Sequence, residues 1–288
     1  MTQPTPLTAP STEVFVPCWP TESTPADLVQ LVVDQPDLTA AVLGLPEVSV
    51  AAGWPKKLAV AEMVPSSTPG RGVQVHMAPV AFEVSRAASA SRRSFDLFPG
   101  ISCVHLLVRT ACDRTLTTQR SASTTFFPSA WSLTCEEQLD VGPDATLGDV
   151  VRRGLLEELN VPSRAVVSSL VLTAGDEHDL SVQPAERLGV AFLCQVELSL
   201  SWAELKDVAL DAHDIHELQQ LAAIGPCASS DLLAAFPGTS GPEELCARVG
   251  VGFETMLLVP EPGAPAGWHP TAFPRLQASA SVEARPAQ

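Results

Sequence analysis

The stretch TLGDVVRRGLLEELNV, residues 146–161, decides the fold of this chain. Thr146 with Asp149 three positions later has the pattern of a capping box, which marks the start of a helix. Asn160 tolerates the left-handed conformation in which helices commonly end. Four apolar residues recur every four positions between these signals: Leu147, Val151, Leu155 and Leu159. Residues at this spacing share one face of a helix, so we expect a helix from about Thr146 to Leu159 whose apolar face packs on a sheet.

Strand-like runs lie on both sides of the expected helix. Before it, residues 101–110 and 115–121 are joined by a short polar turn and predict a hairpin, and a further strand is expected in 132–139. After the helix, we expect strands at 166–173 and 187–198 and a short helix at 201–210. Residues 213–224 are left unassigned, and a last helix is expected from Pro242 to about Phe253. Because strands and helices interleave, the sequence predicts an α/β layer arrangement.

The residues before this region are expected to form an N-terminal extension or small α+β subdomain over 13–95. Thr24-Pro25 is expected to open a helix, because proline is favoured at the first helical position. Two strand-like runs follow at 58–64 and 73–84, and the Ser/Ala/Arg-rich residues 85–94 are interpreted as a linker or exposed helix. The Pro-rich ends, 1–12 and 259–288, have no periodic apolar face and are expected to be disordered.

The chain is strongly acidic. Its 288 residues include 17 Lys and Arg against 33 Asp and Glu, a formal net charge of -16. This charge opposes binding to nucleic acid or to anionic membranes, and the sequence has no concentrated basic patch that would reverse it. An acidic protein that handles an anionic ligand needs a bridging cation, so Mg²⁺ or Mn²⁺ with oxygen ligands is the expected cofactor.

The cysteines and the chain start point to an intracellular setting. Seven cysteines lie far apart without a C-x-x-C pair, which favours reduced thiols over structural zinc. The N-terminal residues lack the pattern of a signal peptide, and no run of about 18 apolar residues could cross a bilayer. We therefore expect a cytoplasmic protein, for which a homodimer is one option.

Residues 153–161, Arg-Gly-Leu-Leu-Glu-Glu-Leu-Asn-Val, resemble the signature helix of the Nudix superfamily. Five positions match this signature: Arg153, Leu155, Glu157, Glu158 and Val161. A hairpin and a Pro-x-x-Trp segment (128–131) precede the helix, as in many members of the family. The resemblance implies a Nudix-like α/β/α sandwich with a mixed sheet over residues 96–258.

Positions 154, 157 and 158 lie on one face of the expected helix, because residues three and four apart are neighbours. In the family, carboxylates at these positions gather divalent ions that neutralise a diphosphate and activate a water for attack at phosphorus. Glu157 and Glu158 are therefore implied as catalytic residues and metal ligands. Arg153 is four residues before Glu157, and an ion pair between them would fix the glutamate.

Gly154 is the main departure from the family pattern, because a metal-binding glutamate is usual at this position. Asn160 replaces a glycine, and Leu139 and Ala145 stand where the upstream part of the signature has glycine and glutamate. A glycine within a helix costs roughly 1 kcal/mol relative to alanine, so Gly154 implies close packing or space for a ligand.

Other carboxylates could replace the missing one. Glu136 and Glu137 precede the helix in an expected strand, where one of two adjacent residues should face inward, and Glu137 is the favoured catalytic residue and metal ligand. Glu217 is a further metal candidate, as is Glu186, since family members often take a ligand from this later region. Two more residues are expected to bind substrate: Arg120 and Trp131.

Several other polar groups have a simpler interpretation. The cluster His213, Asp214, His216 and Glu217 could bind zinc or iron, but a surface loop is favoured. Residues 176–179 are expected to form an exposed turn, and His105 a hydrogen-bonded core residue. Cys135 lies in a context that also resembles isopentenyl-diphosphate isomerase, yet a buried small residue is the simpler interpretation.

Three functions remain open at this point. The first is a divergent metal-dependent hydrolase that cuts a diphosphate linkage of a nucleotide or related compound. The second is a module that keeps the fold and binds a small-molecule ligand without turnover. The third is an isomerase-like or biosynthetic variant that acts on another diphosphate.

Overall fold

The computed structural model describes most of the central part of the chain. The described residues are 19, 22–39, 56–65, 72–82, 101–121, 129, 131–142, 144–179, 186–214, 217–226, 242–257 and 271–272. The linker expected at 85–94 and the N-terminal residues 1–12 lie outside them. The same holds for the C-terminal tail, except for Thr271 and Ala272.

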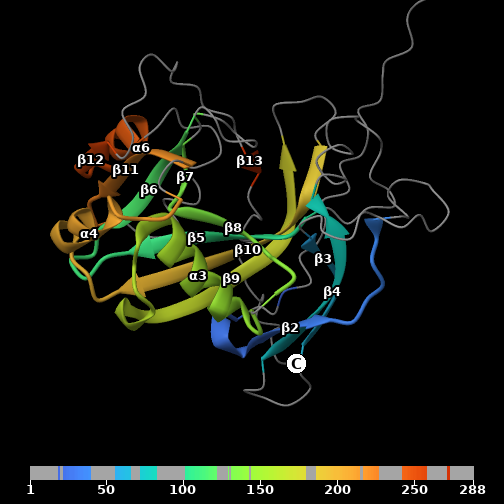
Figure 1. Cartoon of the computed structure of the whole chain (residues 1–288). Coiled ribbons are helices and arrows are strands. Elements are labelled where there is room, and N and C mark those ends of the chain that lie inside the picture. The colour runs from blue at the N-terminus through green and yellow to red at the C-terminus, as the bar shows by residue number, and fades with distance from the viewer. Residues whose placement is uncertain are drawn as a thin grey trace, which may run out of the picture.

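A ten-stranded sheet forms the body of the molecule (Figure 1). Its main order is β1-β9-β10-β5-β6-β11-β12, and β7, β8 and β13 pair with β6, β5 and β9. β10 runs parallel to β5, whereas β9 and β10, like β5 and β6, are antiparallel. The bounds are β1 Thr24–Pro25, β5 Cys103–Arg109, β6 Thr115–Arg120, β7 Trp131–Leu133, β8 Cys135–Gln138, β9 Val166–Asp179, β10 Glu186–Leu198, β11 Leu218–Ile224, β12 Phe253–Leu257 and β13 Thr271–Ala272. The mixed sheet and the hairpin of β5 and β6 confirm these predictions.

The helix α3, Leu147–Leu159, begins and ends as the sequence predicts. The Thr146 hydroxyl accepts from the backbone N–H of Asp149, whose carboxylate accepts from the Thr146 N–H at 3.0 Å. Asn160 takes the left-handed conformation, with a φ of 51°. The predicted apolar stripe is fully buried: Leu147, Val151, Leu155 and Leu159.

The strands alternate their apolar side chains between two cores, as expected for a sheet covered on both faces. Leu106 in β5 and Cys194 in β10 belong to the core under α3. Their neighbours Leu107 and Leu193 belong to the opposite core, which includes Cys246 of α6, Pro242–Val249. Helices on the two faces confirm the α/β/α layering. The other helices given by the described residues are α4, Trp202–Ala209, and the 3-10 turns η1, Ala26–Leu28, and η2, Ser163–Ala165.

A smaller sheet in the order β2-β4-β3 is formed by residues between β1 and β5 of the main sheet. β2, Val29–Val33, is parallel to β4, Val73–Ala81, and β3, Lys56–Pro65, is antiparallel to it. The two predicted strand-like runs are therefore strands. Val75 and Met77 of β4 share one buried core with the apolar face of α3, so this sheet packs on the same core as the helix.

Three local predictions were wrong. The segment after Thr24-Pro25 is a single 3-10 turn followed by β2, because the β-branched run at 29–33 pairs with β4. The last helix ends at Val249, where Gly250 adopts a φ of 72°, and Phe253 starts β12. Residues 176–179 continue β9 and pair with β10, so they form strand in place of the expected turn.

In the described part of the chain, no helix is long and apolar enough to cross a membrane.

Candidate active site

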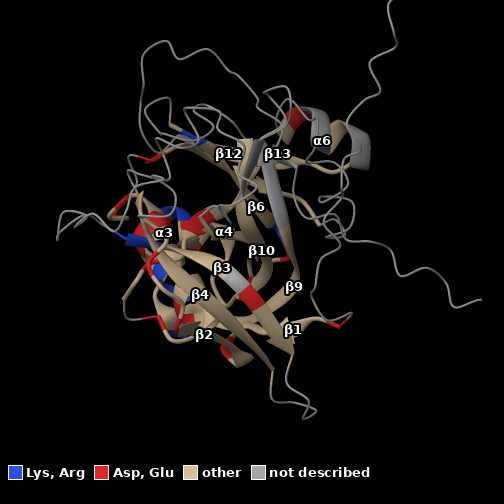
Figure 2. Ribbon diagram, turned by 90° about the vertical axis from the view of Figure 1, so that its right-hand side faces the viewer, with Lys and Arg blue, Asp and Glu red and all other residues tan. Residues whose placement is uncertain are grey.

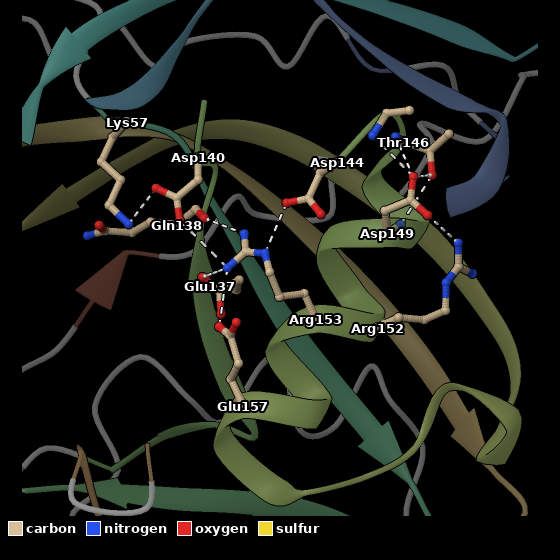
Figure 3. Close-up of polar contacts among 11 residues, drawn as sticks. Lys57, Glu137, Gln138, Asp140, Asp144, Thr146, Asp149, Arg152, Arg153 and Glu157 are labelled. Carbon is tan, nitrogen blue, oxygen red and sulfur yellow. Dashed lines mark hydrogen bonds and ion pairs between the residues drawn. The ribbon is translucent and has the colours of Figure 1, made fainter. Parts of the chain in front are cut away.

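Arg153 is the centre of an ion-pair network on α3 (Figure 3). The predicted ion pair with Glu157 is present, but Glu137 and Asp144 are closer to the guanidinium. The contacts are Nη1 to Glu137 Oε1 at 2.8 Å, Nε to Asp144 Oδ2 at 3.0 Å, Nη2 to the Gln138 carbonyl at 3.1 Å, Nη1 to Glu157 Oε2 at 3.4 Å and Nη1 to Asp140 Oδ2 at 3.7 Å. The guanidinium of Arg153 is thus within ion-pair distance of four carboxylates. Figure 2 shows acidic and basic residues around α3.

Glu137 occupies the space that a side chain at position 154 would need. A Cβ placed on Gly154 would lie 3.1 Å from Cβ, 3.2 Å from Oε2 and 3.3 Å from Cγ of Glu137. The Oε1 atom of the same carboxylate accepts from Arg153, so Oε2 is the oxygen that lies against the helix. Close packing is therefore the reason for the glycine, and the group packed there is a carboxylate.

Glu158 is buried on the same side of α3 and lies near several other acids. Burial raises the pKa of Glu158 well above its ordinary value, with further increases from Glu137, Glu217 and Glu136 and an opposing effect from Arg120. Burial likewise raises the pKa of Glu137 to about 7, although Arg153 opposes it. In the absence of a further positive charge, both carboxyl groups therefore hold their protons more tightly than usual.

Glu136, the neighbour of Glu137, contacts a different set of polar side chains, which lie within the sheet. Its carboxylate accepts from Arg120 Nη1 at 2.7 Å and from the Ser132 hydroxyl. His105 is buried in β5 as predicted, with Nδ1 3.6 Å from Glu136 Oε1. Burial works to raise the pKa of Glu136, but Arg120 and His105 bring it below its ordinary value. Glu136 is thus held as an anion by neighbours within the sheet.

The loop before β11 lies at the C-terminal half of α3. The backbone N–H of Asp214 donates to the Glu157 carbonyl at 2.9 Å, and that of Ser121 donates to the Glu217 carbonyl at 2.8 Å. The Glu217 side chain is exposed, and its negative charge contributes to the raised pKa of Glu158. His213 is exposed and pairs with Asp214, which fits the predicted surface loop, whereas His216 lies outside the described residues.

The other predicted site residues are more peripheral. Trp131 is buried in β7, and its register partner in β6 is Gln119, next to Arg120. Cys135 is a buried core residue, as predicted; burial and the nearby charge of Glu158 raise its pKa, which keeps the thiol protonated. The side chain of Glu186 lies outside the described residues.

The donor chemistry of this region fits a hard divalent cation, since Glu137, Glu158, Glu157 and Glu217 offer only carboxylate oxygens. Oε2 of Glu137 lies beside Gly154, the helix position at which the Nudix signature has a carboxylate side chain. Among the described residues, however, no group of three or more His, Cys, Asp or Glu side chains is already arranged to hold a metal ion. Cation binding would therefore require these carboxylates to converge further.

Sequence reasoning missed three residues of the network: Lys57, Asp140 and Asp144 (Figure 3). The side chain of Asp144 is almost fully buried and pairs with Arg153, while Asp140 pairs with Lys57 at 2.7 Å. The two aspartates flank the turn before α3, where acidic residues ordinarily serve as turn formers. A buried aspartate cannot be recognised from such a segment, because turn composition is polar whether or not the side chains are exposed.

No protein-family model and no curated protein matches the chain. Several solved structures are similar to part of it, including Nudix hydrolases. One is a MutT protein from Methanosarcina mazei Go1, with 23% identity over 41% of this chain and 80% of that protein, at a TM-score of 0.23. An Ap4A hydrolase from C. elegans has 16% identity over 40% and 87% of the two chains, at a TM-score of 0.24. DR0079 from Deinococcus radiodurans has 17% identity, a TM-score of 0.26, and coverage of 38% of this chain and 64% of its own length. At these TM-scores the likenesses assign no role to any residue of this chain.

Proposed function

We propose that the chain is a divergent metal-dependent hydrolase that cuts a diphosphate linkage in a nucleotide or related small molecule. The observation that carries this proposal is the position of Glu137, whose carboxylate fills the space beside Gly154. The altered helix thus regains from strand β8 the carboxylate that its own sequence lacks. The chain would keep the three carboxylates of the signature, two from α3 and one, that of Glu137, from β8.

The proposed ligands of Mg²⁺ or Mn²⁺ are Glu137, Glu157 and Glu158, with Glu217 at the exposed side. A bound cation would neutralise the diphosphate and lower the pKa of an attacking water. Arg153 would orient Glu137 and Glu157 through the contacts at 2.8 and 3.4 Å. Arg120 and Trp131 are proposed to contact the substrate, and the net charge of -16 disfavours nucleic acid as that substrate. A cytoplasmic setting and a homodimer also remain predictions.

The test is hydrolysis of a panel of nucleoside diphosphates and dinucleoside polyphosphates with Mg²⁺ or Mn²⁺. Glu158→Gln and Glu137→Gln should each lower kcat/KM by about 100-fold or more, because groups that support a metal already cost 10- to 100-fold when lost. Glu243→Gln, which changes an exposed glutamate on α6, serves as the matched control and should retain full activity. Wild-type protein that is inert toward the whole panel with either metal would rule out the proposal.

A ligand-binding module without turnover is the second candidate, and the ion pairs favour it. Arg153 and Arg120 already provide positive charge to Glu137 and Glu136, so these two carboxylates are partly compensated without a metal ion. Calorimetric titration of the same compounds separates the two functions. Binding that persists in Glu158→Gln, with no hydrolysis by the wild type, would support the module, and turnover would exclude it.

A further inference from the structure

The smaller, N-terminal sheet reaches the site directly through the backbone of β3. The N–H of Leu58 donates to the Leu139 carbonyl at 2.8 Å, and the N–H of Val141 donates to the Lys56 carbonyl at 3.3 Å. Between these bonds, Lys57 and Asp140 form an antiparallel bridge. The residues that follow β8 therefore run beside the start of β3, which fixes Lys57 opposite the turn that leads into α3.

The side chains continue this contact toward the site (Figure 3). Lys57 Nζ lies 2.7 Å from Asp140 Oδ1, and both side chains are at least partly buried. Asp140 Oδ2 lies 3.7 Å from Arg153 Nη1, the same nitrogen that donates to Glu137 at 2.8 Å. Asp140 thus has two cations in reach and is paired with the lysine, while the arginine nitrogen remains with Glu137.

We infer that Lys57 is a positioning residue of the site, which engages Asp140 so that Asp140 does not draw Arg153 away from Glu137. This inference rests on the proposed function for its effect on catalysis, but the arrangement of the charges is independent of it. Without the lysine, Asp140 would be a partly buried carboxylate whose remaining cationic neighbour is Arg153, 3.7 Å away. Such a group gains most by moving onto the nearest cation, and that cation is Arg153. The N-terminal sheet would then be a component of the site and not only a support for the core.

If Asp140 and Glu137 compete for Arg153, a second substitution at Asp140 should restore the activity lost in a Lys57 variant. Lys57→Gln should lower kcat/KM by about tenfold or more, since displacing a catalytic group by one ångström can cost about 100-fold. Lys57→Gln combined with Asp140→Asn should regain most of the activity, because a neutral asparagine does not compete for the guanidinium. Lys57→Arg should keep near wild-type activity. A lysine that served only the stability of β3 would not be rescued by a change at Asp140.

Lys56→Gln is the matched control, since Lys56 is the adjacent residue and its ion pair with Asp37 has a similar length of 2.6 Å. Neither residue of that pair is among the ion-pair partners of Arg153, so the control should lose the ion pair without affecting the site. A second readout follows the Nε–H signal of Arg153 by NMR, assigned with Arg153→Lys. The signal should shift in Lys57→Gln, return toward its original position in the double variant and stay unchanged in Lys56→Gln.

The two readouts separate the possible failures. An Arg153 signal that is unchanged in Lys57→Gln would overturn the inference, whatever the activity. A double variant that remains as impaired as Lys57→Gln in both readouts would also overturn it. If the Arg153 signal responds as expected but the wild type hydrolyses nothing, the positioning by Lys57 stands and the proposed hydrolase activity fails.

Discussion

Gly154 of α3 has no side chain, and the side chain of Glu137 from β8 lies in the space beside it. A glutamate at position 154 would extend from α3 toward the same space that Glu137 enters from β8. The two arrangements would crowd each other, since even a Cβ at position 154 would lie 3.1 Å from Glu137 and require its side chain to shift. Under the proposed function, Glu137 replaces the carboxylate that position 154 lacks.

Gly154→Ala tests this replacement at the residue scale. The added methyl group should push Glu137 aside and lower kcat/KM by about tenfold, as expected for a small misplacement of a catalytic group. The global stability should change by less than about 1 kcal/mol, because the gain in helix propensity offsets the crowding. Steady-state kinetics and denaturant unfolding measure the two effects.

Gly142→Ala provides the control, because a Cβ at that glycine meets no atom within 4 Å. Its activity should equal that of the wild type. Wild-type kinetics in Gly154→Ala would show that activity does not depend on the present position of the Glu137 side chain.

The start of α3 sets the direction of the whole element and therefore the position of Arg153. The Thr146–Asp149 capping box is joined by Arg152, which pairs at 2.8 Å with both Asp149 and Asp27. Gly148 allows this approach, since a Cβ there would lie 2.0 Å from Asp27 Oδ1. Asp27 of η1 thus contacts the first turns of the helix from outside.

Thr146→Ala should lower the free energy of unfolding by about 1 kcal/mol, the usual cost of losing a helix cap. It should also lower kcat/KM, because a frayed first turn lies close to Asp144 and its partner Arg153. Ser201→Ala removes the equivalent capping box of α4 and should cost similar stability without affecting catalysis. Equal kinetics in the two variants would contradict a role of the α3 cap in the site.

At the scale of the whole molecule, buried acids make the stability of the metal-free protein depend on pH. Folding raises the pKa of Glu137 from 4.5 to about 7, mainly through burial. The folded state therefore keeps a proton that the unfolded chain releases. The resulting stabilisation is complete below pH 4.5 and is lost as the pH rises to about 7.

Glu137→Gln should remove this dependence, because the amide keeps the shape of the side chain and does not titrate. In the presence of a chelator, the stability of the variant relative to wild type should increase from pH 5 to pH 7. Urea unfolding at several pH values measures the difference. A constant difference over this range would show that the pKa of Glu137 is not raised in the folded protein.

The sequence alone determined the local features of the central element. The helix bounds, the Thr146 cap, the Asn160 stop and the buried leucine stripe follow from propensity and periodicity within sixteen residues. The hairpin and most strands could be predicted for the same reason. Local patterns failed at the segment after Thr24-Pro25 and at residues 176–179, because pairing with β4 and β10 overrode the preferences of short polar or capping sequences.

Only the tertiary structure decided how the charges meet. Glu137 is favoured over Glu136 from the sequence, but the two have the same chemistry and adjacent positions, so their contacts could not be predicted. The pleat of β8 directs Glu137 to Arg153 and Gly154, and Glu136 to Arg120. Lys57 and Asp140 are 83 positions apart in the sequence and meet because the start of β3 runs beside the residues that follow β8. Such contacts depend on strand register between distant segments, which no local pattern encodes.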